Sequence, residues 1–138
     1  MVRQLNGADA LLMIGASDRD ADLYYATRFR APDPFVFLWT TGEKILLANS
    51  LEIDRARDQA RVDRVLAYAE YEERAKERGA DLPSAKEVLL ELLRDLALQK
   101  LQVPADFPLG TADFLRSAGV ALEVAGEPLF PERQIKDE

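Results

Sequence analysis

The sequence predicts an α/β domain built on a mixed sheet of about six strands. Three observations lead to this prediction. Short apolar runs alternate with charged, helix-forming segments, two of the runs are joined by a glycine-containing turn, and one helix begins with a capping pattern. The chain has 138 residues, a length typical of one domain that buries roughly two thirds of its unfolded surface.

The first strand is predicted at residues 10–14, a continuous apolar run that Gly15 ends. Continuous apolar runs are typical of strands covered on both faces, so this strand is expected at the centre of the sheet. The aspartate-rich segment after it offers side-chain caps for a short helix through Leu23, Tyr24 and Tyr25.

Residues 35–39 and 45–48 are two apolar runs separated by the turn at residues 41–43. This length and composition predict a tight hairpin between buried strands in the middle of the sheet. A helix is expected next, with Ser50 as its N-cap and Glu52 in its first turn, where the helix dipole favours an acid.

Further strands and helices are predicted in the second half of the chain. Residues 64–68 contain an apolar run of strand length, and residues 69–79 are dense in charge and predict a solvated connection or a short helix. Ser84 and Glu87 have the spacing of a capping box. The leucines of residues 88–96 follow at helical intervals, so we expect this helix to dock its apolar face on the sheet.

Two strands and one helix complete the predicted domain. Residues 100–103 form a short strand that Pro104 ends or places at an edge. Residues 108–119 have proline near the first turn and glycine after the last, as helices do. Residues 120–125 predict the last strand, and residues 132–138 are a charged end without apolar periodicity.

Composition excludes several classes of function. With 18 basic and 25 acidic residues the net charge is -7, which disfavours binding to nucleic acid or an anionic membrane. The chain contains no cysteine and no histidine, so it can form neither a disulfide, a thiolate nucleophile, a Ser-His-Asp triad nor an imidazole zinc site. No apolar run has the length of a membrane span or of a signal-peptide core, and we predict a cytoplasmic protein.

Three alternating aspartates, Asp18, Asp20 and Asp22, have the spacing of calcium ligands. A calcium loop of this type also needs glycine at its sixth position and glutamate at its twelfth, where this chain has Leu23 and Phe29. We therefore interpret the aspartates as a solvated loop and helix cap.

Residues 28–34 predict an exposed irregular loop, because its two prolines remove backbone donors and favour extended conformations. Two arginines around an aromatic ring are suited to grip a carboxylate or the acidic edge of a partner. The alternative is a surface loop whose phenylalanine packs in the core. The candidate residues for a substrate lip or interface are Arg28, Phe29, Arg30 and Asp33.

Several motifs follow one another in a characteristic order. They are an aspartate-led Leu-Tyr-Tyr segment, an Arg-Phe pair, a Pro-Asp-Pro-Phe segment, the hairpin, the charged helix after it, and two proline-containing segments near the end. These motifs occupy residues 22–25, 28–29, 32–35, 35–48, 52–56, 103–110 and 129–136. In this order they resemble the N-terminal domain of Xaa-Pro aminopeptidases, prolidases and creatinase.

The resemblance implies helices on both faces of the sheet and a topology related to ribonuclease H. It implies a creatinase/prolidase N-terminal-like domain at residues 1–127 and, at residues 128–138, the start of a linker to a C-terminal catalytic domain that this sequence lacks. Two divalent metal ions are expected in that absent domain, so no catalytic, cofactor or metal residue is expected here. In such enzymes the loop at residues 28–34 lies near the active-site mouth of the neighbouring subunit.

The implied function is a non-catalytic domain of a metal-dependent Xaa-Pro peptidase that contributes to dimerisation and controls substrate access. The implied partners are a second copy, in a homodimer, and short Xaa-Pro peptides bound by the absent domain. The alternative is a stand-alone protein-interaction module descended from that domain, without peptidase activity. A two-metal nuclease is disfavoured, because such enzymes place an acid in the first strand and residues 11–14 contain none.

Overall fold

The computed structural model describes residues 5–136, with side chains described as far as Arg133. Within that range six strands form one mixed sheet in the order β4-β3-β2-β1-β5-β6. The strands are β1 (Ala10–Gly15), β2 (Phe35–Thr40), β3 (Lys44–Ala48), β4 (Arg64–Ala67), β5 (Lys100–Val103) and β6 (Ala121–Val124). The predicted fold class is confirmed.

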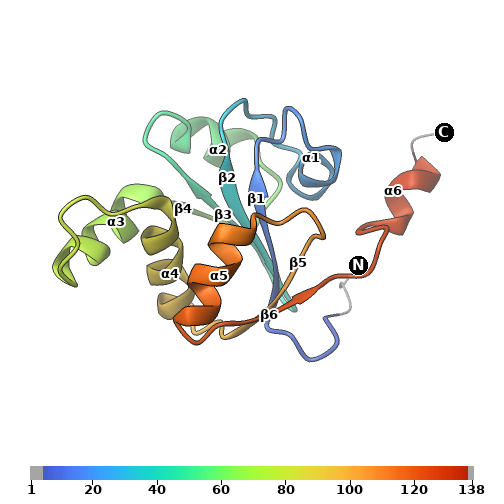
Figure 1. Cartoon of the computed structure of the whole chain (residues 1–138). Helices are drawn as coiled ribbons and strands as arrows, with labels where there is room; N and C mark the ends of the chain where they lie inside the picture. Colours follow the sequence, from blue (N-terminus) through green and yellow to red (C-terminus); the bar gives the residue numbers. More distant parts are fainter. Residues whose placement is uncertain (1–4, 137–138) are drawn as a thin grey trace.

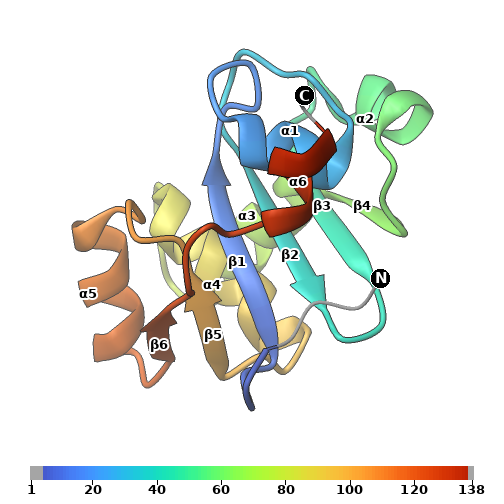
Figure 2. The same cartoon turned by 90° about the vertical axis from the view of Figure 1, so that its right-hand side faces the viewer.

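Helices cover both faces of the sheet. Figure 1 shows α3, α4 and α5 on one side of the sheet and α1 and α6 on the other, and in Figure 2 α1 and α6 lie in front of the strands. The helices are α1 (Ala21–Thr27), α2 (Ile53–Gln59), α3 (Tyr68–Glu77), α4 (Ala85–Asp95), α5 (Leu109–Ser117) and α6 (Pro131–Lys136).

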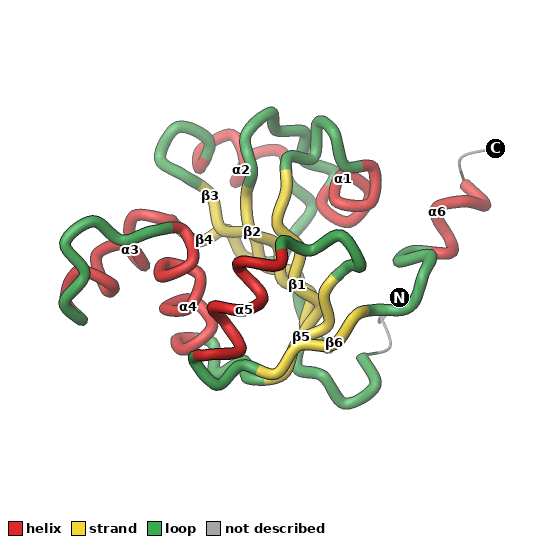
Figure 3. Tube along the Cα trace, in the orientation of Figure 1, coloured by secondary structure: helices red, strands yellow, loops and turns green. Residues whose placement is uncertain are grey.

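The hairpin supplies the one strand that runs against the others. Strand β2 is antiparallel to β1 and to β3, whereas the β3–β4, β1–β5 and β5–β6 pairs are parallel. The register of the hairpin pairs Leu38 with Ile45. All strands except β2 therefore end at one edge of the sheet, which we call the carboxyl edge; in the tube of Figure 3 the turns into α1 and α2 lie there.

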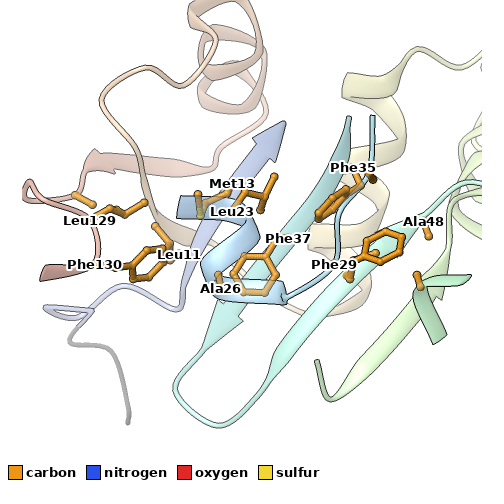
Figure 4. Packing of buried hydrophobic residues seen from close by; sticks show 14 of the residues in the cluster. Leu11, Met13, Leu23, Ala26, Phe29, Phe35, Phe37, Ala48, Leu129 and Phe130 are labelled. Carbon is orange, nitrogen blue, oxygen red and sulfur yellow. The ribbon is translucent and has the colours of Figure 1, made fainter. Parts of the chain in front are cut away.

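Alternation along the strands creates two cores. Leu11 and Met13 of β1 face the core beneath α1, α2 and the C-terminal segment, and Leu12 faces the core beneath α3, α4 and α5. Figure 4 shows the first core, with Leu11 and Met13 close to Leu23 of α1 and to Phe130. A continuous apolar run at the sheet centre is explained by burial on both faces.

The helix predicted from its capping box is confirmed as α4. The Ser84 side chain accepts a hydrogen bond from the Glu87 backbone N–H, and the Glu87 carboxylate accepts one from the Ser84 N–H. The following leucines are buried in the second core.

The N-cap prediction for α2 was wrong. The N-cap is Glu52, without a side-chain cap hydrogen bond, so Glu52 precedes the first turn and the acid within that turn is Asp54. The Asn49 side-chain oxygen accepts from the N–H groups of Leu51 and Glu52 in the turn before the helix. Of the two alternatives for Pro104, ending the strand is the one observed, because β5 lies between β1 and β6.

Two segments without apolar periodicity form helices. The charged residues 69–79 lie almost entirely in α3, which is held by the buried side chains of Tyr71 and Ala75. Residues 131–136 form α6 directly after Leu129 and Phe130, which are buried in the first core. The boundary at residue 127 stays a prediction, and the last two residues lie outside the described range.

No helix within residues 5–136 is long and apolar enough to cross a membrane.

Candidate functional site

The loop of candidate residues begins where α1 ends. The Asp20 carboxylate caps the start of α1 by accepting from the Leu23 N–H at 3.1 Å. At the other end Arg28 adopts a left-handed conformation, with φ of 53°, and its N–H donates to the Tyr24 carbonyl at 2.7 Å. This reversal sends residues 28–34 across the carboxyl edge toward β2.

A buried serine holds the loop in place. The Ser17 hydroxyl donates to the carbonyl of Phe29 and accepts from the N–H of Ala31 at 2.8 Å. Only 2% of Ser17 is exposed. The backbone on both sides of Arg30 is therefore held by one side chain.

The structure brings Arg28 and Arg30 together through a shared aromatic ring. The Arg30 guanidinium lies 4.4 Å from the centroid of the Tyr24 ring, and that of Arg28 lies 5.8 Å from the same centroid. Arg28 also lies 5.2 Å from the centroid of the Tyr25 ring. Contacts between cations and aromatic faces hold both side chains at the surface.

The other two candidates lie elsewhere. Phe29 is 1% exposed, and its ring lies 5.7 Å from that of Phe35 (Figure 4). The Arg55 guanidinium lies above the Phe29 ring. Its packing in the core is the alternative that the sequence left open. Asp33 is exposed and does not line the pocket formed by the arginines.

That pocket has a volume of about 360 Å³ and joins the loop to α1 and α6. We call it the arginine–tyrosine pocket. Its lining residues are Ser17, Asp18, Arg19, Asp20, Ala21, Tyr24, Tyr25, Arg28, Arg30 and Arg133.

Charges in this pocket are unevenly neutralised. Arg30 lies 3.7 Å from an exposed carboxylate oxygen of Asp18, and Arg133 donates to Asp22 at 2.9 Å. Within the part of the chain that the structure describes, no carboxylate forms an ion pair with Arg28. Arg28 therefore has a guanidinium available for an added carboxylate or phosphate.

Tyr25 closes one side of the pocket. Its hydroxyl donates to the Glu132 carboxylate at 3.1 Å. Burial of the ring, and then this hydrogen bond, raise the pKa of Tyr25. The hydroxyl therefore stays protonated at neutral pH and ties α1 to α6.

Sequence reasoning missed the tyrosines and the C-terminal arginine of this site. Tyr24 and Tyr25 were recognised as helical, but nothing local indicates that they face the loop. Arg133 reaches Asp22 across 111 positions of sequence, a pairing that only the packing of α6 on α1 creates.

The three alternating aspartates are engaged separately. Asp18 approaches Arg30, Asp20 caps α1, and Asp22 binds Arg133. No group of three metal-ligating side chains occurs among the described residues. The arginines over aromatic rings have a chemistry suited to an anionic or aromatic group.

Comparison with known proteins identifies the fold. No protein-family model and no curated protein sequence matches the chain significantly. Among solved structures, the creatinase/prolidase N-terminal domain of an X-Pro dipeptidase from Streptococcus pyogenes is 14% identical, with a TM-score of 0.55; the match covers 87% of this chain and 89% of that one. This chain has the creatinase/prolidase N-terminal fold.

Two longer proteins contain the same fold. The prolidase from Pyrococcus horikoshii is 17% identical, with a TM-score of 0.56 over 85% of this chain and 28% of the prolidase. The X-Pro aminopeptidase from Thermotoga maritima is 13% identical, with a TM-score of 0.63 over 95% of this chain and 33% of that protein. The chain thus spans about a third or less of these enzymes, and at such identities the likeness concerns the creatinase/prolidase N-terminal fold alone.

Proposed function

We propose that this chain is the non-catalytic N-terminal domain of a metal-dependent Xaa-Pro peptidase, of the aminopeptidase P or prolidase type. In that enzyme it contributes to dimerisation and controls access to the substrate site. The observation that carries the proposal is the pattern of coverage: the chain matches most of a solved N-terminal domain but only 28% of a prolidase.

The residue composition of this chain agrees with a non-catalytic role. Two divalent metal ions would belong to a catalytic domain, because the described residues offer no metal-binding group and the whole sequence has no histidine or cysteine. When bound, such ions activate water for attack on a peptide bond. What this chain adds is a rigid surface.

Arg28 and Arg30 are the residues proposed to act at that surface. Held on Tyr24, they offer planar hydrogen-bond donors suited to the carboxylate of a short peptide or of a second subunit in a homodimer. Because Ser17 fixes the loop, the donors are positioned before a ligand arrives. We place the parent enzyme in the cytoplasm, which agrees with a sequence free of cysteine.

A stand-alone interaction module is the second candidate. The observation that favours it is that Leu129 and Phe130 are buried in the first core. Such a module would use the same arginine–tyrosine pocket for a partner with acidic residues, without any peptidase activity.

The first experiment determines the size of the natural product by immunoblotting source-cell lysate with an antibody against this chain. A band far heavier than 15.5 kDa is expected. With added divalent metal, the full-length protein should then release the N-terminal residue from Xaa-Pro peptides or cleave Xaa-Pro dipeptides. This chain alone should hydrolyse nothing. A band at 15.5 kDa would favour the interaction module.

The second experiment tests the loop within the full-length protein. The double variant Arg28→Ala/Arg30→Ala is expected to raise the KM for short peptides, weaken the dimer, or both. Arg116→Ala, which removes an exposed arginine of α5, is the matched control. Unchanged KM and unchanged dimerisation in the double variant would remove the loop from the proposal.

A further inference from the structure

A second cavity opens at the carboxyl edge, on the opposite face from the arginine–tyrosine pocket. It lies between the sheet and the first turns of α4 and α5, which run side by side in Figure 1. Its volume is about 330 Å³, within the range of roughly 300–1,000 Å³ typical of ligand sites. We call it the edge cavity. Most of its lining is apolar and includes Ile14, Val36, Leu47 and Leu89.

The polar groups of the edge cavity favour an anion. Lys86 is the only charged residue that lines it within residues 5–133. Helix α5 begins at the cavity with Pro108 as its N-cap, without a side-chain cap and without an acid in its first turn. Asp33 and Glu87 are each next in sequence to a lining residue but do not line the cavity, and the Glu87 carboxylate accepts a hydrogen bond from the Ser84 N–H. A ligand with an apolar body and one negative charge near Lys86 is therefore complementary to it.

Three exposed leucines lie close in sequence to residues that line the cavity. Three large apolar side chains are more than two thirds exposed, and each lies within a few positions of a residue that lines the cavity. They are Leu51 at 87%, next but one to Asn49; Leu82 at 91%, shortly before Ala85; and Leu109 at 71%, directly after Pro108. A molecule small enough to fill the cavity would leave these leucines in water. An occupant that extends beyond the cavity would also cover them.

We propose that the edge cavity binds the C-terminal end of an apolar peptide. The last side chain of the peptide enters the cavity, its free carboxylate pairs with Lys86, and the preceding residues lie against the exposed leucines. This arrangement combines a buried apolar anchor with a charge at the rim, as in other sites that capture chain ends. It does not depend on the role of Arg28 and Arg30.

The test is fluorescence anisotropy with a labelled hexapeptide of alanine and leucine that ends in phenylalanine. The peptide with a free carboxylate is expected to bind this chain at least tenfold more tightly than the same peptide with a C-terminal amide. Lys86→Gln should abolish that difference. Lys76→Gln, which removes an exposed lysine of α3 that does not line the cavity, is the matched control and should leave the affinity unchanged.

Two further variants test the contributions of the cavity and of the leucines to binding separately. Ala85→Trp adds bulk at an exposed position of the lining, so it should block binding without unfolding the chain, as checked by the thermal unfolding midpoint. The double variant Leu82→Ser/Leu109→Ser should weaken binding of the peptide at least fivefold and leave the affinity for the small carboxylate 3-phenylpropanoate unchanged.

Three outcomes would overturn the proposal. These are equal affinity for acid and amide, no binding of either peptide at 1 mM, and binding of 3-phenylpropanoate as tight as that of the peptide. The last would identify a small-molecule site in place of a peptide site.

Discussion

The rings of Trp39 and Phe130 lie with their centroids 5.7 Å apart, joining the hairpin to a segment near the C-terminus. The Phe130 ring also lies 5.4 Å from that of Tyr25 and is 2% exposed. The C-terminal segment therefore completes the first core. Its removal would expose the aromatic face of β2.

Phe130→Ala is expected to lower the free energy of unfolding by about 3–5 kcal/mol, because it leaves a cavity among aromatic rings. Trp39 is the only tryptophan in the chain, so urea unfolding followed by its fluorescence measures the loss and reports the local change. Leu82→Ala removes an exposed side chain and is the control. A loss no larger than that of the control would show that the segment is not part of the core.

Ser17→Ala is expected to lower the free energy of unfolding by about 1–3 kcal/mol, since it leaves the buried Ala31 N–H unpaired and the Phe29 carbonyl with only the Thr27 hydroxyl at 3.4 Å. Hydrogen exchange at the Ala31 amide should accelerate more than exchange in the strands. Ser117→Ala, at an exposed serine of α5, should change stability by less than about 0.5 kcal/mol. Unchanged exchange at Ala31 would contradict the anchoring role of Ser17.

Glu91 joins α4 to α3 by binding two arginines. Its carboxylate accepts from Arg78 at 2.6 Å and from Arg94 at 3.1 Å, and only 5% of the residue is exposed. The hydrogen bond from Arg78, more than any other contact, lowers the pKa of Glu91. Because the folded state favours the ionised form, this stabilisation is present above the ordinary glutamate pKa and is lost as the pH falls through the lowered value.

Glu91→Gln is therefore expected to lower the free energy of unfolding by about 1–3 kcal/mol at neutral pH. The difference from the original protein should shrink as the pH falls below about 4, measured by urea unfolding at several pH values. Glu73→Gln, at an exposed position of α3, is the control. A difference that does not depend on pH would mean that the carboxylate charge is not what stabilises the helix pair.

Tyr71 is expected to lose its proton at a higher pH than an ordinary tyrosine. Burial, and then its hydrogen bond of 2.7 Å to Asp95, raise the pKa of Tyr71 to about 12. The corresponding stabilisation is complete below the ordinary value near 10 and is lost as the pH rises through about 12. Phenolate absorbance should show one group titrating at this high pH, absent in Tyr71→Phe. An identical titration curve for the variant would contradict this prediction.

Local patterns predicted most of the fold. The apolar run of β1, the turn of the hairpin and the Ser84–Glu87 capping box each act over a few residues, and all three were confirmed. Helix α3 was harder to predict because its stability comes from Tyr71, which binds Asp95 of another helix. Helices without a regular apolar stripe depend on such contacts.

The candidate site was predicted in part. Arg28 and Arg30 stood out because they flank an aromatic residue in a proline-rich loop, and the structure places both on Tyr24. Phe29 shares that sequence pattern but packs in the core, since alternate residues of an anchored loop face opposite ways. Sequence spacing alone does not distinguish the two environments.

By itself, the sequence determined the fold class, the central position of β1 and the absence of histidine and cysteine chemistry, because these follow from composition and short-range periodicity. Only the tertiary structure decided that Arg133 binds Asp22, that Phe130 reaches Trp39 and that Lys86 lines an apolar cavity. These pairings join residues distant along the chain. They arise when helices pack on a sheet, and no local pattern encodes which side chains then meet.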